Sequence, residues 1–180
     1  MPMYSKEPVW LSPNEVIKKY FNVCNERKIH EKFLARLYDA HLLRGKINRK
    51  TKKIELLEES WLDLLLLINH NLHSQLIPLN GEPIKIYAPK YYHTLDGKLI
   101  TDSNKTWYTP SELLNIYDFL EHEKIFTVEF VGSLSDTGIL RGHFNNTEKC
   151  RHILLPSFNK LLEYREHTIV QNLFFPNSLL

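Results

Sequence analysis

The sequence has few cysteines and no long apolar run, and both absences exclude classes of protein. Its two cysteines, Cys24 and Cys150, form no disulfide pattern, which is typical of proteins in a reducing compartment. The longest apolar run, from Leu64 to Ile68, is far shorter than the roughly 20 residues that a transmembrane helix needs. We therefore expect a cytoplasmic protein that does not interact with a membrane.

Sequence motifs for catalysis and for cofactor binding are also lacking. The chain contains no glycine-rich phosphate loop and no nucleophile elbow, and it has no paired motif of carboxylates or histidines suited to metal-assisted hydrolysis. Cys150 and His152 supply one thiol and one imidazole, but the second pair that a structural zinc site needs is missing. The sequence therefore predicts no catalytic residues, no cofactor and no metal site.

A segment that starts at Trp10 occurs again 97 residues later, at Trp107. Both copies, WLSPNEVIKKYFN and WYTPSELLNIYDF, carry the signals of a helix start: Ser or Thr at the N-cap, Pro at the first helical position, and Glu three residues after the cap. The same offset continues without a gap, and about 19 of about 71 aligned positions are identical, where chance would give roughly four or five. We interpret this similarity as an internal duplication.

Each copy has the pattern of two helices, a hairpin and a third helix. After the opening helix of the first copy, Asn25 to Ala40 carries apolar residues at helical spacing. Two extended stretches between Leu42 and Leu57 flank a polar tip, as in a β-hairpin, and Glu58 to Asn71 predicts the third helix. In the second copy, Ile125 to Asp136 has strand propensity, but the duplication favours a helix there, and the closing helix is expected from Pro156.

Two pairs of equivalent residues are expected to hold this unit together. Trp61 and Phe158 are expected to be core residues that face the first helix of each copy. Gly45 and Gly142, at the start of each hairpin, are expected to allow close backbone packing. The predicted fold class is α+β and mainly α, with module 1 over residues 10–80, a partly ordered connecting insert over residues 81–106, and module 2 over residues 107–177.

The order of helix, helix, two-stranded wing and polar-capped helix resembles the winged helix-turn-helix, specifically its short MerR-like or excisionase-like form. The residues that match are Ser12, Glu15 and Val16 in the helix opening, His41-Leu42-Leu43 and Gly138-Ile139-Leu140 in the turn, Arg44 to Lys53 in the wing, and Glu58-Glu59, Trp61 and Leu64 in the closing helix. The resemblance covers about 60 residues of each copy. It implies two tandem DNA-binding modules, as in bacterial or phage proteins that regulate transcription.

The first copy is basic and the second is acidic. Residues 10–80 contain 12 Lys+Arg and 8 Asp+Glu, a net charge of +4, whereas residues 107–177 contain 6 and 9, a net charge of −3. In the first copy the cations gather in the wing and on one stripe of the second predicted helix. Alternate residues of a strand share a face, and so do helix residues that are four apart. The candidate nucleic-acid-binding residues are Arg27, Lys28, Lys32, Arg36, Arg44, Lys46, Arg49, Lys50, Lys52 and Lys53.

The primary hypothesis is that the first copy binds double-stranded DNA through its second helix and its wing. An ordinary solvated hairpin tip would show the same basic pattern. The alternative function is a protein-interaction adaptor with the same fold and no nucleic-acid binding, which would use a protein partner or a homodimer through module 2 and the insert. Tyr87, Tyr91 and Tyr92 are the candidate residues for that interaction, because aromatic side chains are enriched where interfaces bury most energy.

Overall fold

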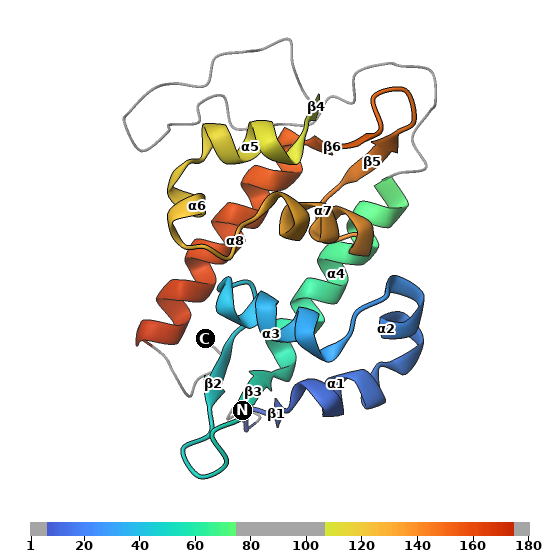
Figure 1. Ribbon diagram of the computed structural model, residues 1–180. Helices are drawn as coiled ribbons and strands as arrows, with labels where there is room; N and C mark the ends of the chain where they lie inside the picture. The colour runs from blue at the N-terminus through green and yellow to red at the C-terminus, as the bar shows by residue number, and fades with distance from the viewer. Residues whose placement is uncertain (1–6, 75–106, 175–180) are drawn as a thin grey trace, which may run out of the picture. The chain divides into compact units, whose positions relative to one another are not determined.

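The computed structural model of this protein describes residues 7–74 and 107–174 (Figure 1). The predicted α+β, mainly helical class is confirmed, and each repeat has the same order of elements: a short strand, three helices, two strands and a long helix. The first repeat contains β1 (Trp10–Leu11), α1 (Pro13–Lys19), α2 (Phe21–Arg27), α3 (Glu31–Asp39), β2 (Gly45–Ile47), β3 (Ile54–Leu57) and α4 (Glu58–Ser74). The second contains β4 (Trp107–Tyr108), α5 (Pro110–Ile116), α6 (Phe119–His122), α7 (Val128–Thr137), β5 (Gly142–Asn145), β6 (Cys150–Leu154) and α8 (Leu155–Phe174).

The strands of each repeat form a three-stranded antiparallel sheet. The strand orders are β1-β3-β2 and β4-β6-β5, so both predicted hairpins are confirmed. The register also follows the duplication, because Trp10 pairs with Leu57 and Trp107 pairs with Leu154. The opening strands β1 and β4 are absent from the sequence prediction, since two residues are too few to produce an alternating pattern.

The predicted helix starts are confirmed at both repeats. The Ser12 hydroxyl accepts a hydrogen bond from the Glu15 amide at 3.2 Å, and the Glu15 carboxylate accepts one from the Ser12 amide at 3.3 Å. Thr109 and Glu112 make the same pair of bonds at 3.2 and 3.4 Å. These reciprocal bonds satisfy amides that have no partner within the helix and fix where α1 and α5 begin.

The single helix predicted over residues 25–40 is wrong, because the chain forms α2 and α3 with a break between them. Lys28 ends α2 in the left-handed conformation, with φ 58°, and the next amide, that of Ile29, bonds to the Cys24 carbonyl at 2.8 Å. The His30 side chain then caps α3 by accepting from the Phe33 amide at 3.2 Å. The break places Ile29 in the core, where it is buried.

The helix expected from the duplication between Ile125 and Asp136 is confirmed as α7. Thr127 caps it by accepting a hydrogen bond from the Phe130 amide at 3.1 Å. Phe130 and Leu134 are fully buried on its inner face. Burial at helical spacing therefore outweighs the strand propensity of this stretch.

The described residues form two compact units. One contains residues 7–66 and 163–174, and the other contains residues 67–74 and 107–162. The closing helices α4 and α8 are each divided between the units as a result. Within residues 7–74 and 107–174, no helix combines the length and the apolar character that crossing a membrane requires.

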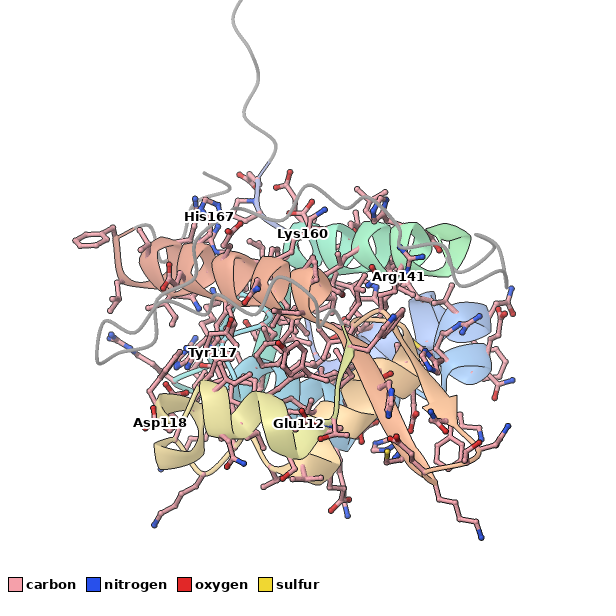
Figure 2. All side chains as sticks on the ribbon, turned by 90° about the horizontal axis from the view of Figure 1, so that it is seen from above. Glu112, Tyr117, Asp118, Arg141, Lys160 and His167 are labelled. Atoms are coloured by element: carbon pink, nitrogen blue, oxygen red, sulfur yellow. The ribbon has the colours of Figure 1, made fainter. Side chains whose placement is uncertain are left out.

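The predicted core residues Trp61 and Phe158 are fully buried. In the first unit, the ring of Trp61 contacts that of Tyr20 at the end of α1, with 5.9 Å between centroids. In the second unit, Phe158 lies 5.4 Å from the ring of Tyr117, whose hydroxyl donates to Asn159. Tyr117 points into the space between α5 and α8 (Figure 2). Each closing helix thus anchors its own repeat through an aromatic residue.

The far half of each closing helix binds carbonyls at the end of another helix. In the second unit, the buried Asn71 side chain of α4 donates to the carbonyls of Gly138 and Ile139, both at 2.8 Å. In the first unit, the buried guanidinium of Arg165 on α8 donates to the Ala40 carbonyl at 3.0 Å. These side chains supply hydrogen bonds to carbonyls that follow α7 and α3 and have no partner within the helix.

Candidate nucleic-acid interface

The tip of the first hairpin, residues 48–53, is a closed turn held by Asn48. The Asn48 side-chain oxygen accepts from the amides of Lys50 and Thr51, at 2.8 and 3.2 Å. The backbone of Asn48 bonds to Lys52 at 2.7 Å and to Lys53 at 2.9 Å, and Lys52 takes a left-handed conformation with φ 56°. The asparagine thus satisfies the turn internally and leaves the lysine side chains outside it.

Four cations lie exposed on this tip: Arg49, Lys50, Lys52 and Lys53. None of them forms an ion pair with a residue that the structure describes. The nearest acid, Glu55, is half-buried and accepts a hydrogen bond from the Asn48 side-chain amide at 2.7 Å. The tip therefore presents positive charge that its surroundings do not neutralise.

Lys46 lies below the tip on β2, where it is half-buried. Its ammonium group sits 4.2 Å from the centroid of the Trp10 ring, and its strand partner is Glu55. The aromatic face attracts the ammonium group. Lys46 thus remains a cation on the sheet surface, with its position fixed by Trp10.

The helical part of the basic surface is smaller than the sequence predicts. Lys32 and Arg36 lie four residues apart along one side of α3, where Lys32 is exposed and Arg36 is half-buried. Lys28 is no longer on this stripe, because it ends α2 in the left-handed conformation. Just before it, the Arg27 side chain pairs with Glu26 at 3.3 Å.

Arg44 differs from the other candidates because it is buried, with 6% of its surface exposed. Its guanidinium donates to the Gln171 side chain at 3.0 Å, and its amide donates to the Ser60 hydroxyl at 2.9 Å. Burial lowers the pKa of this guanidinium. Arg44 is part of the packing of the first unit, and we leave it out of the exposed basic surface.

A small cavity of about 100 Å³ lies beside Arg44 in the first unit. Burial raises the pKa of the Tyr164 hydroxyl on its wall, and burial with the nearby charge of Glu59 raises that of Asp63. The cavity has room only for a few water-sized molecules. It is lined by Arg44, Leu57, Glu59, Ser60, Asp63, Tyr164, His167, Thr168 and Gln171.

The second hairpin, between β5 and β6, carries little free positive charge. Arg141 is buried, and the Arg151 guanidinium forms two hydrogen bonds of 2.7 Å with the Asp136 carboxylate, which raises the pKa of Arg151. Lys149 is exposed at the tip, next to the Glu148 carboxylate in the sequence. This surface is a poor match for a phosphate backbone.

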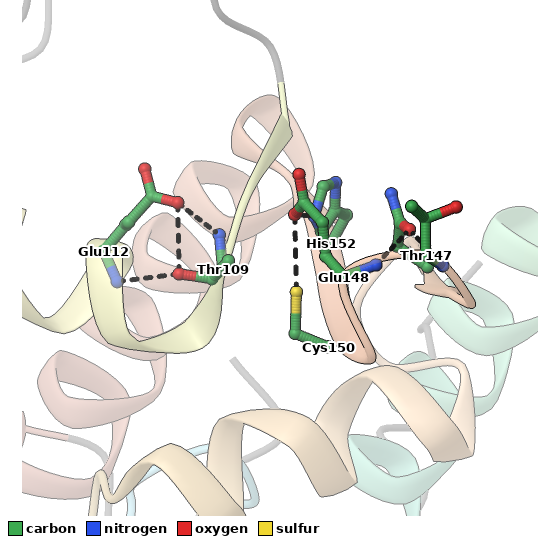
Figure 3. Close-up of polar contacts among 7 residues, drawn as sticks. Thr109, Glu112, Thr147, Glu148, Cys150 and His152 are labelled. Carbon is green, nitrogen blue, oxygen red and sulfur yellow. Dashed lines mark hydrogen bonds and ion pairs between the residues drawn. The ribbon is translucent and has the colours of Figure 1, made fainter.

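Three potential ligand side chains gather on this second hairpin (Figure 3). The Glu148 carboxylate lies 2.7 Å from His152 Nε2 and 3.6 Å from the Cys150 thiol. Partial desolvation and the carboxylates of Glu148 and Glu112 raise the pKa of that thiol. Burial and His152 lower the pKa of His143 across the strand pair. Glu148 is not among the residues that the sequence predicts, because it lies in the turn before β6, where strand alternation does not place its side chain beside Cys150 and His152.

The remaining predicted interaction residues, Tyr87, Tyr91 and Tyr92, lie outside the described residues. Comparison with known proteins adds no relative: no protein-family model, no curated protein and no solved structure matches the chain.

Proposed function

We propose that the first repeat binds double-stranded DNA through its wing tip and α3. The observation that carries this proposal is the set of four exposed cations on the closed turn after β2, namely Arg49, Lys50, Lys52 and Lys53, none paired with a described acid. The resemblance to winged helix-turn-helix modules gives the same assignment. A regulatory or accessory role on bacterial or phage DNA fits such a module.

The chemistry of these groups suits the phosphate backbone more than the bases. Lysine ammonium groups act as mobile point charges toward phosphates, and each contact releases a counterion from the DNA. Lys32 and Arg36 on α3 add cations on a helix of the same unit. Binding through these residues contributes affinity that depends little on sequence and strongly on salt.

Binding of the full chain to a random 30-base-pair duplex across a salt series tests this proposal. We expect binding at low salt and a steep linear fall of log affinity with log salt concentration, because counterion release drives the association. No binding at low salt would contradict the proposal. Binding that is insensitive to salt would also contradict it, because phosphate contacts by lysine must weaken as salt rises.

A second candidate function is a protein-interaction adaptor, favoured by exposed apolar side chains at the end of α8. Val170, Leu173 and Phe174 are 48, 70 and 71% exposed, and their spacing places them on one side of the helix. An adaptor that self-associates would give a mass above that of one chain in light scattering. Replacement of Leu173 and Phe174 by serine would then return the mass to that of a monomer.

A further inference from the structure

The outer faces of the two sheets carry different chemistry at equivalent positions. In the first repeat, Lys46 pairs with Glu55 across the ladder and stacks on Trp10. In the second repeat, the pair at the same positions is His143 and His152. The full set of equivalent positions is Trp10 and Trp107, Lys46 and His143, Thr51 and Glu148, Lys53 and Cys150, and Glu55 and His152. The first sheet thus carries mainly cations at these positions, whereas the second carries a carboxylate, a thiol and imidazoles.

Three of these side chains converge on one point. The ligand atoms of Glu148, Cys150 and His152 all lie within 4.8 Å of one another. The distances from the Glu148 carboxylate are 2.7 Å to His152 Nε2 and 3.6 Å to Cys150 Sγ. In a tetrahedral zinc site, ligand atoms at about 2.0 to 2.3 Å from the ion lie roughly 3 to 4 Å apart. The 2.7 Å between the Glu148 carboxylate and His152 Nε2 is shorter than this spacing, so these two side chains must move apart to admit an ion.

We propose that Glu148, Cys150 and His152 form a binding site for a divalent transition-metal ion of the Zn²⁺ class. One sulfur, one nitrogen and one oxygen ligand suit a borderline-soft cation and exclude Mg²⁺ and Ca²⁺, which prefer oxygen ligands alone. The Glu148 side chain is 59% exposed, so the fourth coordination position opens to solvent. This site is separate from the basic wing and does not depend on DNA binding.

The surroundings of the cluster favour a cation. Glu112, held at the start of α5 by Thr109 (Figure 3), adds a second carboxylate that acts on Cys150. The nearest arginine, Arg151, projects to the other face of β6, where Asp136 binds its guanidinium at 2.7 Å. Among the described ion pairs, the partner of Glu148 is His152, which is itself a proposed ligand.

Titration of the full chain with Co²⁺ tests the site, because a thiolate ligand gives Co²⁺ a charge-transfer absorption that oxygen and nitrogen ligands do not. We expect one Co²⁺ per chain with this band, and its displacement by Zn²⁺. Cys150→Ser should remove the band, and His152→Gln should weaken Zn²⁺ binding at least roughly tenfold. The controls Cys24→Ala and His41→Asn replace a cysteine and a histidine outside the cluster and should leave the band and the affinity unchanged.

Alkylation of the unsubstituted protein gives a second test that does not depend on a variant folding. Zn²⁺ should slow the reaction of iodoacetamide with Cys150, as measured by mass spectrometry of the peptide that contains it, because a metal-bound thiolate is a weaker nucleophile. Absence of the thiolate band, its persistence in Cys150→Ser, or equal alkylation rates with and without Zn²⁺ would each overturn the proposal.

Discussion

The longest run of identical residues in the two repeats is Leu-Arg-Gly, at 43–45 and 140–142. Packing explains this identity. Both leucines are fully buried. The amides of Arg44 and Arg141 donate to Ser60 and Ser157 at 2.9 and 2.8 Å, so the serine that is identical in both copies also has a structural role. The arginine that occurs in both copies therefore connects the hairpin to the closing helix, although its charge alone suggests a phosphate contact.

The glycine of this triplet gives a prediction about stability. A Cβ at position 45 would lie 2.7 Å from the Glu55 carbonyl oxygen and 2.8 Å from the Tyr38 ring, closer than backbone and side chain can approach without strain. We expect Gly45→Ala to lower the free energy of unfolding by about 1 to 3 kcal/mol, as overpacking does. Urea unfolding followed by circular dichroism measures the change.

Gly132 is the matched control for this substitution. The nearest atoms to a Cβ there belong to the flexible Arg151 side chain, at 3.4 Å, and the residue lies inside α7. Because alanine favours a helix interior over glycine by about 1 kcal/mol, Gly132→Ala should leave the stability unchanged or raise it. Equal losses for Gly45→Ala and Gly132→Ala would contradict the close approach at Gly45.

Among the helices and strands, the features that depend on local side-chain contacts could be predicted from the sequence. The starts of α1 and α5 could be predicted because Ser12 and Thr109 bond to amides three residues away. The break between α2 and α3 could not be predicted, because lysine, here Lys28, is unusual in the left-handed conformation and histidine is an unusual N-cap. The convergence of Glu148 with Cys150 and His152 depends on the conformation of the turn before β6, which the sequence does not specify.

The helix break predicts an unusual gain of stability. Lys28 has a φ of 58°, where a side chain is strained and glycine is not. Lys28→Gly should therefore raise the free energy of unfolding by about 0.5 to 1 kcal/mol. The exposed Lys160 inside α8 is the control, since Lys160→Gly should cost about 1 kcal/mol. A loss of stability in Lys28→Gly would indicate a continuous helix through this position.

The duplication could be predicted from the identities at a constant offset, and the strand pairs of the two sheets follow it. Which residues make up each compact unit could not be predicted, because the apolar pattern of α4 or α8 does not indicate which carbonyls the C-terminal half of that helix will bind. Asn71 and Arg165 make those bonds, yet they are not equivalent residues of the repeats. The two copies also differ in net charge, which is +4 for residues 10–80 and −3 for residues 107–177.

The salt dependence of DNA binding in two charge-matched variants shows whether the DNA contacts the wing of the first repeat. One variant, Lys50→Gln with Lys52→Asn and Lys53→Gln, removes three cations from the wing tip. The other, Lys124→Asn with Lys149→Asn and Lys160→Gln, removes three exposed lysines of the second unit. Asparagine is used at positions 52, 124 and 149 because these residues have positive φ and asparagine tolerates that conformation.

Both variants change the net charge of the chain equally, so a difference between them reports where the DNA lies. We predict that the wing variant binds a random 30-base-pair duplex more weakly and that its salt slope falls by about 2 to 3, whereas the second-unit variant keeps the slope of the unsubstituted protein. Equal slopes for the two variants would contradict binding through the wing of the first repeat.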